Sequence, residues 1–124
     1  MQFIEEYISN SKLILDQLDR SEIAGMVSII KDTRENEGRL FIIGVGGGAG
    51  HASHAVNDFR KICGVESYSP SDNVSELTAR VNDDGWDTSY VNWLMGSKLK
   101  KEDSLLIFSV GGGNLEKEVR SATN

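Results

Sequence analysis

Residues 40–48 read Leu-Phe-Ile-Ile-Gly-Val-Gly-Gly-Gly, and residues 105–113 read Leu-Leu-Ile-Phe-Ser-Val-Gly-Gly-Gly. Each stretch is a short apolar run that ends in Val-Gly-Gly-Gly and is followed by sequence compatible with a helix. An apolar run of this length between turn residues is typical of a buried strand in a parallel sheet. Glycines directly after the strand let backbone N–H groups crowd around an anion. Two such units predict an α/β domain that binds a phosphorylated ligand at the carboxyl ends of its strands.

The composition indicates one ordinary globular domain. The chain has 124 residues, of which 39% are hydrophobic and 26% charged, and this length suffices for one modest core. The formal net charge is −6. Non-specific nucleic-acid binding relies on basic patches, so this balance argues against a nucleic-acid partner.

The sequence also indicates where the protein resides. Cys63 is the only cysteine, which excludes an internal disulfide and is consistent with a reducing compartment. We expect its thiol to be buried at a helix end. No stretch approaches the roughly 20 apolar residues of a membrane span, and a start with Glu5 and Glu6 is unlike a secretory signal. We therefore expect a cytoplasmic protein with no membrane partner.

Helices and strands alternate along the chain. Amphipathic periodicity and turn residues predict helices at 2–18, 19–37, 49–63, 71–80, 86–97 and 114–122, and strands at 39–45, 65–69 and 104–109. This order predicts a parallel sheet with right-handed crossovers. We interpret residues 1–124 as one domain, with N-terminal helices at 1–37 and an α/β part at 38–124. The chain ends soon after its second glycine loop, so we expect further sheet beyond it.

A histidine and a carboxylate follow the first glycine loop. On a helix, His54 and Asp58 are four residues apart and share a face, and His51 lies one turn earlier on nearly the same face. Such a pair can bind a divalent metal such as zinc or act in acid–base catalysis near neutral pH. Capping and a surface ion pair are the structural alternative. The position beside a strand–glycine loop makes the two interpretations about equal.

Other polar residues lie where the strands and helices end. Ser109 ends the third strand, where its hydroxyl can donate to a phosphate oxygen or simply cap the strand. Asn114 is expected to cap the following helix. Asp83 and Asp84 are expected in a turn, although they could also place a carboxylate in the ligand cleft.

The motifs, taken together, resemble those of the sugar isomerase (SIS) domain family, of the phosphoheptose isomerase type. The resemblance runs from the N-terminal helices to residue 124. It rests on ordered segments at family-like spacing: Gly44-Val-Gly-Gly-Gly48, His54-Ala-Val-Asn-Asp58-Phe-Arg60, Ser71-Asp-Asn-Val-Ser-Glu-Leu-Thr-Ala79, Asn82-Asp83 and Ser109-Val-Gly-Gly-Gly-Asn114.

The resemblance implies a fold and a function. The fold is a parallel α/β sandwich preceded by a helical hairpin, apparently truncated here at the C-terminus, and assembled as a homo-oligomer, a dimer or tetramer. The function is ketose–aldose isomerisation of sedoheptulose 7-phosphate through an enediol. Its product is a heptose phosphate used for lipopolysaccharide or other surface glycans. Zinc is the implied cofactor.

The resemblance also implies roles for individual residues. His54 matches a zinc-ligating histidine, and Asp58 matches a glutamate that is both a zinc ligand and the base for proton transfer. Ser109 matches the first serine of the phosphate loop, and Asp83 falls in the Asn-Asp motif near the sugar. The glycines of the two loops are expected to surround the phosphate: Gly46, Gly47, Gly48, Gly111 and Gly112.

The chain departs from the family pattern at several of these positions. Gly48 stands where the typical enzyme has a phosphate-binding serine, and Val110 and Gly111 replace two further hydroxyl residues. His51 replaces an acidic or amide residue, and Asp58 is one methylene shorter than glutamate. The family's remaining zinc ligands, a Gln and a His, lie in a C-terminal half that these residues do not include. We therefore expect little metal binding or turnover from this chain alone.

Two other functions remain open from the sequence. The SIS superfamily also includes non-catalytic modules that bind sugar phosphates or the replication initiator DnaA. The third possibility is an α/β fragment whose exposed sheet edge is covered by oligomerisation. The paired His54 and Asp58 favour the isomerase, because a scaffold has no need of a metal pair beside a phosphate loop.

Overall fold

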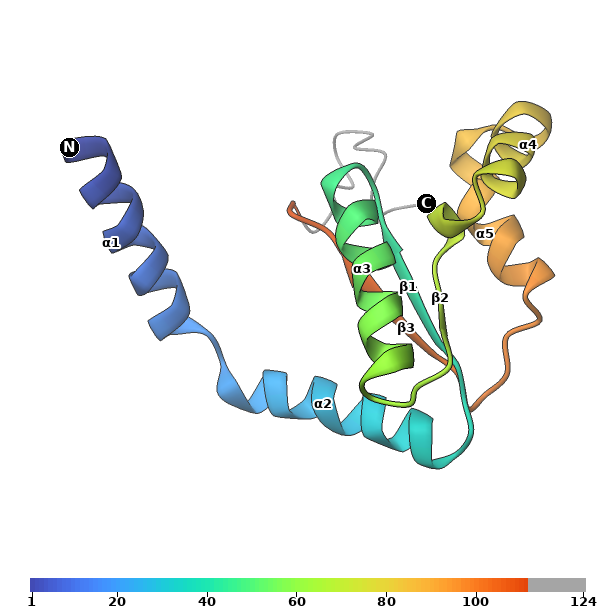
Figure 1. Ribbon diagram of the computed structural model, residues 1–124, viewed down its shortest axis with the longest axis horizontal. Coiled ribbons are helices and arrows are strands. Elements are labelled where there is room, and N and C mark those ends of the chain that lie inside the picture. The colour runs from blue at the N-terminus through green and yellow to red at the C-terminus, as the bar shows by residue number, and fades with distance from the viewer. Residues whose placement is uncertain (112–124) are drawn as a thin grey trace.

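The computed structural model describes residues 1–111 and contains a three-stranded parallel sheet of order β2-β1-β3 (Figure 1). The strands are β1 (Leu40–Gly44), β2 (Ser67–Tyr68) and β3 (Ser104–Phe108). The helices are α1 (Gln2–Gln17), α2 (Arg20–Glu35), α3 (Gly47–Lys61), α4 (Val74–Asp84) and α5 (Trp86–Gly96), with a 3₁₀ turn, η1, at Pro70–Asp72. The predicted α/β class and parallel sheet are confirmed.

The central strand β1 is buried on both faces. Leu40 and Ile42 pack with Ala52 and Val56 of α3 in the main core cluster. Phe41 faces the opposite side, where its ring meets that of Trp93 in α5 edge-on at 5.6 Å between centroids. Successive side chains of a strand point to opposite faces, so a strand covered on both sides becomes the continuous apolar run seen in the sequence.

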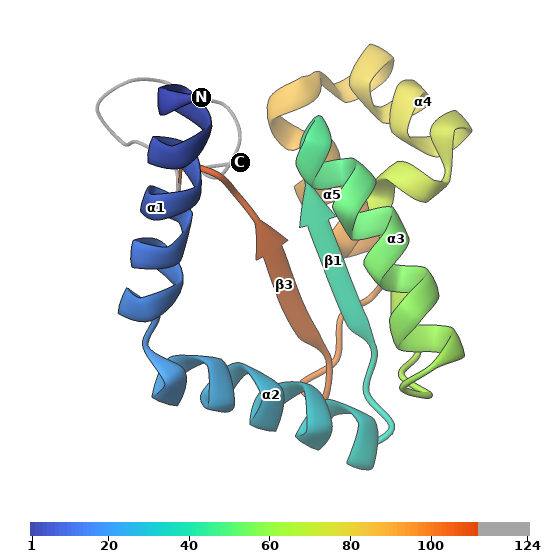
Figure 2. The same cartoon turned by 60° about the vertical axis from the view of Figure 1, so that its left-hand side comes forward.

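The edge strand β3 is covered on one face only. Leu106 and Phe108 pack against the core cluster on the α3 side. Leu105 and Ile107, on the other face, leave 48% and 49% of their surface exposed. Figure 2 shows β3 beside β1, with α3 and α5 near β1 and no helix placed equivalently over β3 among the described residues. The sheet therefore has an apolar strip along β3.

The two N-terminal helices extend from the sheet. Asp19 caps α2, because its side chain accepts hydrogen bonds from the backbone N–H groups of Ser21 and Glu22. The two helices meet at a wide angle, with α2 below the sheet and α1 directed away from it in the view of Figure 1. No residue of α1 is buried.

The junction between α2 and β1 depends on close backbone contact. Gly38 was predicted as the first residue beyond the helix, but Glu37 takes that place with a left-handed φ of 56°. The backbone N–H groups of Glu37 and Gly38 donate to the carbonyls of Arg34 and Thr33, which is the Schellman arrangement. A Cβ on Gly38 would overlap the Glu102 carbonyl. Position 38 therefore requires glycine because the Glu102 backbone lies so close, whereas the left-handed conformation that ends the helix is adopted by Glu37.

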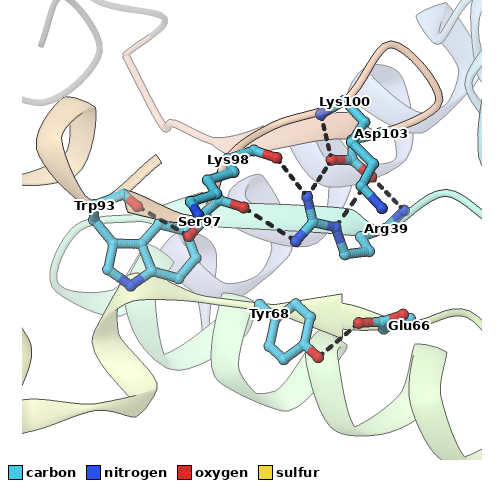
Figure 3. A network of polar contacts seen from close by, with 8 residues as sticks. All are labelled: Arg39, Glu66, Tyr68, Trp93, Ser97, Lys98, Lys100 and Asp103. Atoms are coloured by element: carbon cyan, nitrogen blue, oxygen red, sulfur yellow. Dashed lines mark hydrogen bonds and ion pairs between the residues drawn. The ribbon is translucent and has the colours of Figure 1, made fainter. Parts of the chain in front are cut away.

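Arg39 fixes the start of β3 against the start of β1 (Figure 3). Its guanidinium donates to both carboxylate oxygens of Asp103, with an Nη2–Oδ2 distance of 2.7 Å, and to the carbonyls of Ser97 and Lys98 at 3.1 and 3.0 Å. The same group lies 4.9 Å from the centroid of the Phe41 ring. One cation thus ties the end of α5 and the turn before β3 to the core.

Several predicted boundaries differ from the structure. Helix α3 begins at Gly47 instead of residue 49, and α4 extends to Asp84, so the predicted Asp-Asp-Gly turn reduces to Gly85. Helix α4 begins at Val74 instead of residue 71, and Asn73 caps it, because its Oδ1 accepts from the Glu76 N–H. The predicted helix at 114–122 lies outside the described residues.

The prediction of a buried Cys63 is wrong, since the thiol is exposed. Helix α3 ends at Lys61, and the chain returns to the core only at Val65, which is 2% exposed. No helix within residues 1–111 has the length and apolar character needed to cross a membrane.

Candidate functional site at the carboxyl ends of β1 and β3

The first glycine loop turns the chain sharply from β1 into α3. A Cβ on Gly44 would overlap the carbonyl of Gly48, so the end of the strand and the first helical turn touch through backbone atoms. Gly46 has φ 58° and ψ −120°, a conformation that side chains disfavour strongly. These two glycines set the path of the loop.

The backbone at the start of α3 leaves an N–H group free for a ligand. The N–H groups of Gly48 and Ala49 donate to the carbonyls of Val45 and Gly46. The N–H of Gly47 has no acceptor among residues 1–111. A Cβ built on Gly47 would meet no atom within 4 Å. A free N–H beside open space at a helix N-terminus favours an anion.

The two predicted loops meet in one open pocket of about 540 Å³. It lies where β1 and β3, adjacent parallel strands, both end. Its lining combines the first loop with the end of β3: Val45, Gly47, Gly48, His51, Ile107, Phe108, Ser109 and Val110. Ser109 is exposed there. The pocket brings Gly47, Gly48 and Ser109 together, as the sequence predicts for a phosphate site. Gly112 lies outside the described residues.

His54 and Asp58 form the pair predicted from their spacing. His54 Nε2 lies 3.2 Å from Asp58 Oδ2, and the two side chains are 77% and 45% exposed. Neither residue lines the 540 Å³ pocket, although His54 lies one helical turn beyond His51, which does. The pair is therefore formed and open to solvent beside the pocket.

The distance between the His54 and Asp58 side chains can be compared with the distance between two ligands of one zinc ion. Two ligands of a tetrahedral zinc, each about 2.0–2.2 Å from the metal, lie about 3.3 Å apart. The His54–Asp58 separation of 3.2 Å is consistent with that value. A closed zinc site needs four donors, and residues 1–111 contain no cluster of three potential ligands. His54 and Asp58 therefore have a spacing that suits two zinc ligands and equally suits an ordinary ion pair.

The structure places the remaining predicted residues apart from the pocket. Asp83 is exposed in the last turn of α4, where its Oδ1 accepts from Asn82 Nδ2 at 2.8 Å. It does not line the pocket formed by the two loops. Gly46 and Gly111 flank the pocket lining in sequence. The roles of these residues in binding remain predictions.

Two residues of the site were not assigned by the sequence. His51 lines the pocket, and its place one turn after the glycine loop was the available signal. Tyr90 of α5 donates its hydroxyl to the Gly44 carbonyl at 3.0 Å. Burial raises the pKa of Tyr90, so its hydroxyl stays a donor that supports the loop from beneath. No spacing pattern in the sequence predicts the contact between Tyr90 and Gly44.

The comparisons with known proteins concern the fold. No protein-family model matches the chain, and no curated protein matches it in sequence. Among solved structures, phosphoheptose isomerase GmhA from Neisseria gonorrhoeae matches with a TM-score of 0.77 and 19% sequence identity. The match covers 87% of this chain and 60% of that chain. The chain is therefore similar in fold to a phosphoheptose isomerase, over somewhat less than two thirds of that protein's length.

Proposed function

We propose that this chain is the phosphate-binding part of a sugar-phosphate isomerase that converts sedoheptulose 7-phosphate from ketose to aldose. The observation that carries the proposal is the pocket where β1 and β3 end, lined by Gly47, Gly48 and Ser109. The fold similarity to a phosphoheptose isomerase supports the same class of reaction. The SIS-type motifs of the sequence supply the proposed substrate.

The residues divide between binding and proton transfer. The free N–H of Gly47 and the hydroxyl of Ser109 donate to phosphate oxygens. Asp58, whose Oδ2 lies 3.2 Å from His54 Nε2, moves a proton between C1 and C2 of the sugar. The Asn57 amide donates to Asp58 Oδ1 at 3.2 Å and helps to orient the carboxylate. A phosphate seated in the pocket positions the sugar, which is the main contribution that binding makes to such a step.

Zinc belongs to this proposal as a cofactor completed by ligands outside residues 1–111. When bound, it would supply a Lewis acid for the sugar carbonyl. His54 and Asp58 are the residues of this chain that would hold it. Cytoplasmic location and a place in surface-glycan precursor synthesis follow from the same family resemblance and are part of the proposal.

Isomerisation of sedoheptulose 7-phosphate with added zinc tests the proposal. We expect weak turnover from these 124 residues and full turnover from a form extended by the C-terminal part of the family domain. In the extended form, His54→Gln should remove most of the turnover without unfolding, because the imidazole is 77% exposed and fills no core volume. Ser53→Ala, an exposed change one residue away, is the control. Undiminished turnover after loss of both His54 and Asp58 would exclude the assignment.

A non-catalytic sugar-phosphate sensor is the second candidate. The observation that favours it is the lining itself, in which Gly48 and Val110 replace hydroxyl residues of the family enzyme. Such a module would bind the sugar phosphate with the same affinity with or without zinc. An extended form that binds sedoheptulose 7-phosphate but never isomerises it would establish this alternative.

A further inference from the structure

We propose that His51, in its protonated form, is the cationic group that recognises the phosphate in this pocket. The inference rests on the proposed function and assigns a role to a residue that the family resemblance leaves without one. It concerns the charge that balances a phosphate dianion. A phosphate that accepts hydrogen bonds only from neutral donors binds more weakly than one that also accepts a hydrogen bond from a charged donor.

The position of His51 carries the proposal. The residue lies one helical turn beyond Gly47 on α3, and both line the pocket together with Ser109, which follows β3 directly. The backbone N–H of Gly47, the hydroxyl of Ser109 and the imidazole of His51 therefore line the same pocket. His51 is exposed, so the imidazole can reach a ligand in the pocket without displacing core side chains.

The charge of the lining supports the assignment. Among the described residues that line the pocket, His51 is the one with an ionisable side chain. The segments packed against it, residues 45–48 and 107–110, contain no Asp, Glu, Lys, Arg or His. The nearest ionisable groups on its own helix are His54 and Asp58, which pair with each other at 3.2 Å. Among residues 1–111, a dianion entering the pocket therefore meets one lining side chain able to become positive.

The scarcity of hydroxyl groups in the pocket lining increases the value of a cationic donor at His51. Among the described lining residues Ser109 is the one with a hydroxyl, whereas Gly48 and Val110 stand where the family resemblance implies further phosphate-binding hydroxyls. One imidazolium N–H, which is a charge-assisted donor, replaces part of what those neutral donors would contribute. Because the dianion favours the protonated imidazole, binding and protonation are linked. The affinity for a dianion should therefore rise as the pH falls through the range in which histidine titrates.

Sulfate is the probe that separates this effect from titration of the ligand, because it stays a dianion between pH 6 and pH 8. We expect sulfate to bind the wild-type chain about fivefold more tightly at pH 6 than at pH 8, the size expected for one nearby charge in a solvated site. His51→Gln should remove that difference and match the wild type at pH 8. His54→Gln, on the same helix, should retain it.

Imidazole NMR locates the effect, because the chain has only two histidines. Sulfate at pH 6 should shift the ring signals of His51 and leave those of His54 nearly unchanged. Shifts of the Gly47 and Ser109 backbone amides without a shift of His51, or an unaltered pH dependence in His51→Gln, would overturn the inference while leaving the proposed phosphate site intact. Absence of any shift at Gly47 and Ser109, with sulfate or with sedoheptulose 7-phosphate, would overturn the proposed site itself.

Discussion

Glycine residues have different purposes around the end of β1. Gly44 is needed because backbone atoms of the strand end and of α3 touch. Gly46 is needed for its positive φ. Gly47 and Gly50 meet nothing within 4 Å where a Cβ would lie, and only Gly47 lines the pocket. The same residue type is thus structural at the first two positions and open to a ligand at the third.

This difference gives a matched pair of variants. Gly47→Val should abolish sulfate and sugar-phosphate binding, because its side chain occupies the space in which the anion approaches the free N–H. Gly50→Ala, three residues along the same helix, should bind normally and be more stable by about 0.5–1 kcal/mol, the helical advantage of alanine. Isothermal titration and urea unfolding measure the two effects. Normal binding by Gly47→Val would contradict the placement of the anion.

At the scale of elements, one ion pair holds the connection from α5 to β3. Burial acts to raise the pKa of Asp103, but hydrogen bonds from the Arg39 side chain and from the N–H groups of Lys100 and Arg39 outweigh it and lower the pKa to about 2. The Asp103 side chain is 3% exposed. Hydrogen bonding to Asp103 also raises the pKa of Arg39. The carboxylate is therefore charged in the folded protein at any pH near neutrality.

Stability should fall in acid because of this pair. The pKa of Asp103 drops from 3.8 to about 2 on folding, so the charged form stabilises the fold above about pH 4, and that contribution is lost as the pH falls towards 2. The loss is about 2 kcal/mol. Urea unfolding from pH 6 to pH 2.5 measures it. Asp103→Asn should be less stable at pH 6 and should lose less in acid, whereas Asp16→Asn on exposed α1 should follow the wild type.

At the scale of the whole molecule, α1 has no partner within the described chain. Its apolar side chains are widely exposed, with Phe3 at 77%, Tyr7 at 67% and Leu15 at 66%. Folded monomers rarely expose so continuous an apolar stripe. A second copy of the chain that covers this stripe would bury it, as the helical periodicity of residues 2–18 leads us to expect.

Assembly as a dimer or tetramer is therefore the expected outcome. Light scattering at micromolar concentration should give a multiple of the 13.6 kDa chain mass. Leu15→Glu should dissociate the assembly, because it places a charge within the stripe. Leu13→Glu, the same substitution on the opposite face of α1, should leave the mass unchanged. A monomeric wild type would contradict this expectation.

Local patterns in the sequence determined most of the helices and strands, and they also determined the two loops that line the pocket. Val-Gly-Gly-Gly after an apolar run placed Gly47 and Ser109 at strand ends, because a buried parallel strand requires apolar residues on both faces and a tight exit requires glycine. The spacing of His54 and Asp58 determined that they pair, because residues four apart share a helix face. Such contacts are short-range and can be predicted from neighbours in the chain.

Tertiary structure alone decided which residues face the pocket. His51 lines it and Asp83 does not, because α3 packs against the sheet beside the pocket whereas α4 packs against α5. The Tyr90–Gly44 and Arg39–Asp103 contacts join residues 46 and 64 positions apart. The exposed Cys63 likewise reflects where α3 ends relative to the core. Long-range packing determines these features. A local sequence pattern defines a helix, but it does not define which neighbouring element each face of that helix contacts.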